Sequence, residues 1–171
     1  AVLRMAREYP KSRFVGYDIS KYALARANER LVDSSLTNAR FVDPRSEPLP
    51  SDQSLHFVCT FDCIHDMTHP AAVMHSIRGA LRNDGVWLLV DIKAHEGFAM
   101  NAEKNPMASL MYGVSVMSCL SSAMSTPDGA GLGTLGLSAS TAETMAKAAG
   151  FTSFERLAVE HSVNAFYAIR P

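Results

Sequence analysis

The residue best suited to bind a ligand in this sequence is Asp18, which follows the short apolar run of residues 13–17. Such a run is typical of a buried parallel strand, and open α/β sheets bind ligands at the carboxyl ends of their strands. A carboxylate there can accept hydrogen bonds from both hydroxyls of a ribose. The spacing fits equally well an aspartate that caps the loop or the next helix, so both roles stay open.

Three other patterns resemble named sites, but their context argues against each one. Residues 131–136 spell GxGxxG, yet a dinucleotide fingerprint must lie between a strand and a helix, so we expect a lid or a tight-packing loop. Residues 65–69 place two histidines as in HExxH. There Asp replaces the glutamate and Pro70 makes the second histidine a helix cap, so we predict no metal site. Cys59 and Cys63 could offer thiols, but the strand position of Cys59 favours a small buried side chain, and nothing in the sequence supports a nucleophilic role.

Strands and helices alternate along the chain, which is typical of a parallel sheet covered by helices. We expect helices at 1–9, 21–31, 70–81, 106–126 and 140–150, and strands at 13–17, 39–42, 55–61, 86–91, 151–160 and 162–169. Residues 83–85 read as a turn, and Ser140 with Glu143 as a capping box. The last two strands read as a tightly linked antiparallel hairpin.

Composition excludes several classes of protein. With 171 residues, 47% of them hydrophobic and 19% charged, the chain is expected to fold as one domain. Sixteen basic and seventeen acidic side chains give a net charge of −1, which argues against nucleic-acid binding. Residues 106–127 carry no charge, but their serines disfavour a membrane span. Three cysteines without a CxxC pair favour a reduced, cytoplasmic setting.

Four segments together resemble class I S-adenosylmethionine-dependent methyltransferases. They are RFVGYDIS at 13–20, ARFVD at 39–43 with Leu49-Pro50, TFDCIHDM at 60–67, and LRNDGVWLLVD at 81–91. Their order, spacing and turn chemistry agree with that class over nearly the whole chain. The FDxIHD stretch and the glycine loop at 129–134 are similar to a subgroup that acts on small molecules and often carries an upstream winged helix.

The resemblance implies a fold and an activity. The fold is α/β, a Rossmann-like three-layer αβα sandwich with strand order 3-2-1-4-5-7-6 and an antiparallel last strand. The activity is methyl transfer from S-adenosyl-L-methionine to a small-molecule acceptor. No nucleic-acid or membrane partner is implied, and a homodimer is compatible with the sequence.

The resemblance also assigns roles to particular residues. Asp18, with Ile19 beside it, matches the acidic position that holds the cofactor's ribose, and Phe61 matches the position that lines its methionine end. Arg45 stands where the family usually places the aspartate that binds adenine, and Asp43 is the expected substitute. The remaining expected site residues are Thr60 and Asp62 for cofactor binding, and His65 and Asp66 for acid/base assistance.

Part of the family pattern is absent from this sequence. Residues 1–9 match the helix that follows the glycine-rich cofactor loop, so neither that loop nor the central first strand is represented. We therefore expect residues 1–171 to be a single methyltransferase domain that is incomplete at its N-terminus. Within it, residues 94–137 are the expected lid and acceptor insertion, and their apolar character favours a partly hydrophobic acceptor.

Two other functions stay open. A methyltransferase-like domain without activity could bind a partner or regulate transcription through an upstream segment. A nicotinamide-dependent oxidoreductase would need a proper dinucleotide fingerprint, which the sequence does not show.

Overall fold

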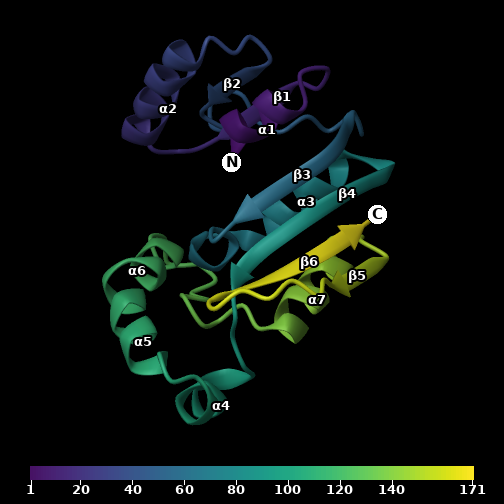
Figure 1. Ribbon diagram of the computed structural model, residues 1–171. Helices are drawn as coiled ribbons and strands as arrows, with labels where there is room; N and C mark the ends of the chain where they lie inside the picture. The colour runs from purple at the N-terminus through teal and green to yellow at the C-terminus, as the bar shows by residue number, and fades with distance from the viewer. The chain divides into compact units, whose positions relative to one another are not determined.

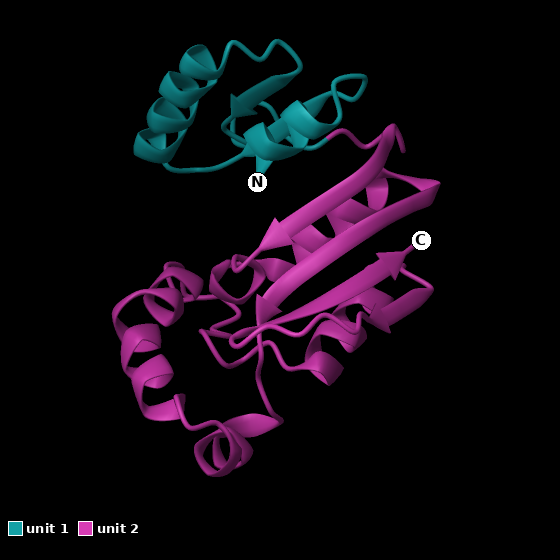
Figure 2. Cartoon of the chain, in the orientation of Figure 1, with its two compact units in different colours: residues 1–49 teal, residues 50–171 magenta.

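Two separate sheets organise the chain. In the computed structural model, which describes residues 1–171, a two-stranded sheet belongs to a first compact unit, residues 1–49, and a four-stranded sheet belongs to a second, residues 50–171 (Figure 2). Each unit builds its own sheet and its own group of polar side chains.

The first unit is a helix followed by a βαβ motif. Its elements are α1 (Val2–Glu8), β1 (Phe14–Tyr17), α2 (Lys21–Ser34) and β2 (Ala39–Val42), and the two strands are parallel (Figure 1). A Cβ atom on Gly16 would lie 2.5 Å from a ring carbon of Phe41, its register partner, so only glycine allows this close strand pairing. The Nδ2 of Asn38 donates to the carbonyls of Ala6 and Ser12, which fixes α1 against the start of β2.

The second unit holds the longer sheet, in the order β3-β4-β6-β5. Strands β3 and β4 are parallel, and β6 pairs antiparallel with both β4 and β5. The pairing in both units agrees with the expected strand order, so the α/β Rossmann-like class is confirmed. The elements are β3 (Leu55–Phe61), the 3₁₀ turn η1 (Ile64–Asp66), α3 (Pro70–Ala80), β4 (Leu81–Ile92), α4 (Gly97–Lys104), α5 (Ala108–Met117), α6 (Cys119–Ala123), α7 (Ala139–Ala148), β5 (Ser153–Arg156) and β6 (Asn164–Arg170).

The core of the second unit lies between the sheet and helices α3 and α7, which pack together on one face (Figure 1). Trp87 of β4 is fully buried there, and its ring centroid lies 5.4 Å from that of Phe151. Its indole Nε1 donates to Thr60 Oγ1 at 3.0 Å, so the one polar atom of this side chain is satisfied. Met74 and Ile77 of α3 complete the same buried layer.

Three local predictions are wrong. Residues 83–85 do not form a turn between helix and strand, because β4 begins at Leu81 and residues 82–85 bulge out of the ladder with β3. The expected helix 106–126 is two helices, α5 and α6, which break at Ser118. The last two strands are joined by residues 157–163 and not by a tight link.

The N-cap of α7 also differs from the expected capping box. Ser138, which is buried, accepts a hydrogen bond from Thr141 N at 3.2 Å, and its hydroxyl donates to Glu96 at 2.9 Å. Ser140 Oγ donates to Glu96 and lies 3.4 Å from Ser138 Oγ but accepts from no backbone N–H of the helix, and Glu143 pairs with Lys147. The cap therefore lies two residues before the expected one and also holds the segment that precedes α4.

Replacing Ser138 by Ala is expected to lower the free energy of unfolding by about 1 kcal/mol, since the helix loses its cap. Ser140→Ala should change it by less than about 0.5 kcal/mol, because that side chain is exposed and caps nothing. Urea unfolding followed by the fluorescence of Trp87, the single tryptophan, measures both. Equal losses in the two variants would contradict this assignment of the cap.

Candidate functional site

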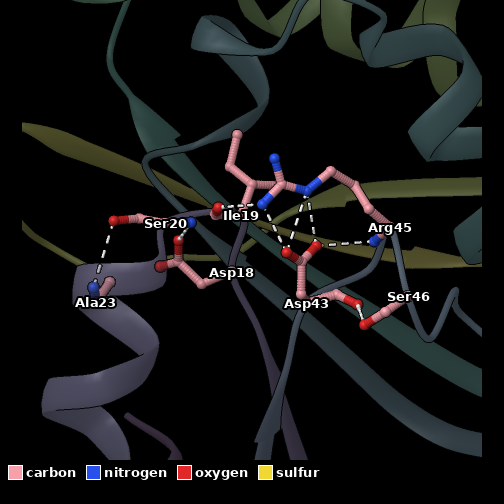
Figure 3. A network of polar contacts seen from close by, with 7 residues as sticks. All are labelled: Asp18, Ile19, Ser20, Ala23, Asp43, Arg45 and Ser46. Atoms are coloured by element: carbon pink, nitrogen blue, oxygen red, sulfur yellow. Dashed lines mark hydrogen bonds and ion pairs between the residues drawn. The ribbon is translucent and has the colours of Figure 1, made fainter.

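The first group of polar side chains lies in unit 1, at the carboxyl end of β1. Asp18 Oδ1 accepts a hydrogen bond from Ser20 N at 2.8 Å, and Ser20 Oγ accepts one from Ala23 N at the start of α2 (Figure 3). Asp18 thus has the loop role that its spacing allowed, while Ser20 is the helix cap. Asp18 is exposed and its Oδ2 accepts no hydrogen bond within the protein, so one carboxylate oxygen is available to a ligand.

Arg45 joins this loop to the end of β2. Its backbone N, Nε and Nη2 all donate to the Asp43 carboxylate, and its Nη2 also donates to the Ile19 carbonyl at 2.7 Å (Figure 3). The hydrogen bonds from Arg45 hold the pKa of Asp43 below its usual range. The structure therefore brings Asp18, Ile19 and Asp43 together, and Arg45 is the bridge between them. In the sequence, Arg45 stood out only because it departs from the family pattern.

In unit 2, the expected cofactor residues Thr60, Phe61 and Asp62 lie at the end of β3. Thr60 faces the core, where it accepts the hydrogen bond from Trp87. Phe61 is 44% exposed. Asp62 has a left-handed backbone with φ 49°, an uncommon conformation for a residue other than glycine. Of the three, Phe61 and Asp62 are therefore open to a ligand.

The carboxylate of Asp62 is held by β6, through a hydrogen bond from the side-chain amide of Asn164. Burial raises the pKa of Asp62, and the nearby charge of Asp91 raises it further. The strained backbone and the side-chain contact together fix the direction in which β3 ends.

The most unusual feature of unit 2 is a buried ion pair. His65 Nδ1 lies 2.5 Å from Asp91 Oδ1, and the two residues are 3% and 2% exposed. Asp91 Oδ1 also accepts from Ile92 N at 2.8 Å, whereas Oδ2 is buried without a partner. Burial lowers the pKa of His65, but the hydrogen bond and charge of Asp91 outweigh it and raise that pKa to about 9.

Asp66, the other expected acid/base residue, is not the partner of His65. Its side chain is half-buried and makes no hydrogen bond to the imidazole, and desolvation raises its pKa. Asp91, 26 residues further along the chain, takes that place. The sequence offered one signal for it, an aspartate at the end of the predicted strand 86–91.

The glycine loop at 129–134 contacts the backbone of η1 and helix α5. Gly133 N donates to the His65 carbonyl at 3.0 Å, and Thr134 N donates to Ser115 Oγ of α5 at 3.0 Å. A Cβ atom on Gly133, whose φ is 68°, would lie 2.6 Å from Ser115 Oγ. The GxGxxG pattern is therefore a tight-packing loop whose glycines allow close approach to α5 and η1.

The two histidines of residues 65–69 have different roles. His65 belongs to η1 and is committed to Asp91, whereas His69 is exposed and precedes Pro70 at the first turn of α3. The thiols of Cys59 and Cys63 are half-buried, and desolvation raises both pKa values, that of Cys63 to about 12. His65 and His69 therefore do not lie on one helix, as the two histidines of HExxH do.

A cavity of about 310 Å³ lies between the segment after β4 and the glycine-rich loop. Aromatic and apolar side chains cover one part of it, and Glu96, Ser138 and Thr141 supply polar groups. The apolar lining residues are Phe98, Tyr112, Leu132 and Leu135. Its size and mixed lining suit a small organic molecule.

No helix of the chain combines the length and the apolar character that crossing a membrane requires.

Comparisons with known proteins give one matching family model and several solved structures of similar fold. A family model described as a methyltransferase domain matches residues 1–151. None of the curated proteins matches this chain. Among solved structures, a putative O-methyltransferase from Nostoc punctiforme superposes with a TM-score of 0.75 at 15% identity, over 99% of this chain and 47% of that one.

Two further structures show the same fold. The CMeT domain of the citrinin polyketide synthase gives a TM-score of 0.70 at 16% identity, over 98% of this chain and 42% of that one. The trans-methyltransferase CalH, in complex with SAH, gives 0.65 at 16% identity, over 92% and 42%. The chain thus spans less than half the length of these three proteins.

Proposed function

Because the chain belongs to the methyltransferase domain family, matched over residues 1–151, we propose that it transfers a methyl group from S-adenosylmethionine to a small-molecule acceptor. The observation that carries the proposal is the buried His65–Asp91 pair directly after β3, where open α/β sheets bind ligands. Burying a charged pair costs desolvation free energy. Histidines whose pKa values are shifted by such a partner cluster at functional sites. The crystallisation of CalH with SAH supports the choice of cofactor.

The residues of unit 1 fit the adenosine half of this cofactor. Asp18 is exposed with Oδ2 free, so it can accept from the ribose hydroxyls while Oδ1 holds the loop. The charge of Asp43 is neutralised by Arg45. In cofactor binding, Asp43 therefore acts mainly by holding the Arg45 guanidinium, which in turn holds the Ile19 carbonyl. We assign adenine recognition to this Asp43–Arg45–Ile19 bridge, in place of a lone aspartate.

The end of β3 is assigned to the methionine half. Phe61 offers a half-exposed ring that can pack on the cofactor's apolar chain, and Asp62 offers a carboxylate that can accept from its ammonium group. Thr60 supports the strand end through Trp87 and has no direct role in this assignment.

The cofactor, when bound, supplies an electrophilic methyl group. The protein's own contribution is to remove the proton that an acceptor hydroxyl, amine or thiol loses on methylation. His65 in its neutral form can accept that proton, and Asp91 then stabilises the imidazolium and keeps its Nδ1 oriented. Because His65 is nearly inaccessible to water, its proton is exchanged chiefly with groups that enter the site.

The domain boundaries and the location are part of the same proposal. Residues 1–171 are proposed to belong to one methyltransferase domain, in which strands β1 and β3 each pair on one side only. Residues 94–137 are proposed as the acceptor insertion, because the 310 Å³ cavity is lined largely by them. Three free cysteines suit the reducing cytoplasm, and a homodimer stays a prediction.

The cofactor assignment is tested by the affinity for S-adenosylhomocysteine of the full-length protein that the gene encodes. Asp18→Asn is expected to weaken binding about 10- to 100-fold, since a hydrogen bond to a charged group is worth roughly 1.5–3 kcal/mol. Asp33→Asn, on the exposed surface of α2, is the matched control and should leave the affinity unchanged. Equal affinities for the Asp18 variant and the parent protein would remove Asp18 from the site, and a folded protein without any affinity would favour the non-catalytic domain.

A further inference from the structure

The cavity of about 310 Å³ has a single carboxylate in its lining, that of Glu96. Its Oε1 accepts a hydrogen bond from Ser140 Oγ at 2.7 Å, and its Oε2 accepts one from Ser138 Oγ at 2.9 Å. These two hydrogen bonds also lower the pKa of Glu96, because they favour its charged form. The carboxylate is therefore held in place from both of its oxygens and is charged at neutral pH.

No lysine or arginine of the protein neutralises this carboxylate. The cavity lining contains neither residue type, and Glu96 takes part in none of the ion pairs of the chain. A carboxylate that is fixed in a cavity wall without a cationic partner can accept further hydrogen bonds from a bound molecule. A positively charged donor is the molecule that it favours most.

The hydroxyl groups beside Glu96 add to the same preference. Ser138 and Ser140 both donate their hydrogens to Glu96. Thr141 Oγ1 lies 2.9 Å from Ser138 Oγ, to which it donates, since the hydrogen of Ser138 is already used. These three hydroxyls therefore have only lone pairs left for a ligand.

Two aromatic rings form part of the apolar lining. Phe98 of α4 and Tyr112 of α5 have ring centroids 5.0 Å apart, with an angle of 43° between their planes. Phe98 is 69% exposed, so a bound molecule can still cover much of its ring. Aromatic faces attract cations as well as apolar groups. The lining thus combines one unneutralised carboxylate with aromatic surface.

We propose that this cavity binds an arylalkylamine, a small molecule with an aromatic ring and a protonated amino group. The ammonium group donates to the carboxylate of Glu96, and the carbon skeleton packs against Phe98 and Tyr112. An alcohol of the same shape loses the charge on the donor, and a carboxylic acid of the same shape is repelled by Glu96. The volume of the cavity suits a ligand of this size.

The role of this amine as the methyl acceptor rests on the proposed function. The glycine loop connects the two sites, since Leu132 lines the cavity and Gly133 N donates to the His65 carbonyl at 3.0 Å. An ammonium group has no lone pair with which to attack the methyl group, so the nitrogen held by Glu96 is an anchor and another atom of the acceptor is methylated. Binding of the amine needs no turnover and is measured separately from it.

The test compares three probes of similar shape and different charge on the full-length protein that the gene encodes. Ligand-observed NMR at pH 7 measures the affinities for phenethylamine, phenethyl alcohol and phenylpropionate. Phenethylamine is expected to bind with a Kd on the order of 1 mM, as fits so small a ligand. It should bind about tenfold more tightly than the alcohol, and phenylpropionate should bind most weakly. Equal affinities for the amine and the alcohol, or no binding of the amine up to about 10 mM, would overturn the proposal.

Variants locate the binding in this cavity. Glu96→Gln should weaken binding of the amine about tenfold and that of the alcohol less than about twofold. Glu103→Gln is the matched control, because Glu103 is an exposed glutamate of α4 that does not line the cavity. An unchanged affinity for the amine in folded Glu96→Gln, with Trp87 fluorescence as the check on folding, would also overturn the proposal.

Two further measurements complete the test. Should Glu96→Gln fail to fold, Phe98→Ala decides, since this side chain is exposed and its loss should weaken binding of the amine about two- to fivefold. An unchanged affinity in Phe98→Ala would then contradict the proposal. The affinity for S-adenosylhomocysteine is measured on the same samples. A protein that binds S-adenosylhomocysteine but not the amine contradicts this inference alone, whereas one that binds only the amine contradicts the proposed function.

Discussion

Replacing His65 by Gln is expected to slow methyl transfer about 10²- to 10⁴-fold, which is the usual contribution of a positioned general base. Glutamine keeps a polar side chain of similar length beside Asp91, but it cannot accept the proton that the acceptor loses. The rate of S-adenosylhomocysteine formation, with any acceptor that supports turnover, measures the effect. The affinity for S-adenosylhomocysteine should stay within about twofold of the parent value, since His65 is assigned to the transfer step and not to cofactor binding.

The same assignment predicts a pH profile. With a pKa of about 9, His65 carries a proton at neutral pH, so the fraction able to act as a base rises about tenfold per pH unit and levels off near pH 9. Asp91→Asn removes the charge that raises this pKa, so the rise should move to lower pH. His69→Gln is the control and should keep both rate and profile. A His65→Gln enzyme that is folded and retains more than a tenth of the parent rate would rule out the base assignment.

The second large effect concerns stability. His65 has a pKa of about 9 in the folded protein and an ordinary value of 6.5 when unfolded. The folded protein therefore binds this proton more tightly than the unfolded chain does, and protonation favours the folded state. The resulting stabilisation is fully present below pH 6.5 and is lost as the pH rises through 9. Its upper limit is about 3 kcal/mol, from 1.36 kcal/mol per pKa unit. Urea unfolding followed by Trp87 fluorescence, between pH 6 and 9, measures this loss in unit 2.

Two variants isolate the contribution of the ion pair. His65→Gln lacks the titrating side chain of this ion pair, so its stability should change much less between pH 6 and 9 than that of the parent protein. Asp91→Asn should be about 3 kcal/mol less stable than the parent protein at pH 6, and the difference should shrink as the pH approaches 9. The raised thiol pKa values act only near pH 9, and Asp91→Asn also removes one of the charges that raise the pKa of Cys63. A parent protein as stable at pH 9 as at pH 6 would contradict a charged His65–Asp91 pair.

The order of the elements could be predicted from the sequence because its signals are local. Each signal depends only on residues close to it in the sequence. The structure contains strands at the apolar runs 55–61 and 86–91, a serine cap before α2 and a proline at the start of α3. The bulge at 82–85 was missed, because Asn, Asp and Gly fit a turn as readily as they fit an irregular strand. The choice between Ser138 and Ser140 as a cap likewise depended on the position of Glu96, 42 residues before the cap.

The candidate site was predictable only in part, for the same reason. Asp18 and His65 follow predicted strands, so their positions could be read from the pattern. Asp91 reaches His65 through the pairing of β4 with β3, which no spacing rule reveals. Arg45 was visible as a departure, but its hydrogen bonds to Asp43 and Ile19 became evident only in three dimensions.

Titration calorimetry with S-adenosylhomocysteine, on the full-length protein beside this 171-residue chain, tests the central claim most directly. Binding of one equivalent by the full-length protein, with weaker or no binding by the shorter chain, is the expected result. It would support S-adenosylmethionine as the cofactor of the protein that contains this chain. A folded full-length protein that binds no S-adenosylhomocysteine would contradict the methyltransferase assignment and leave a domain of this family that acts by binding alone.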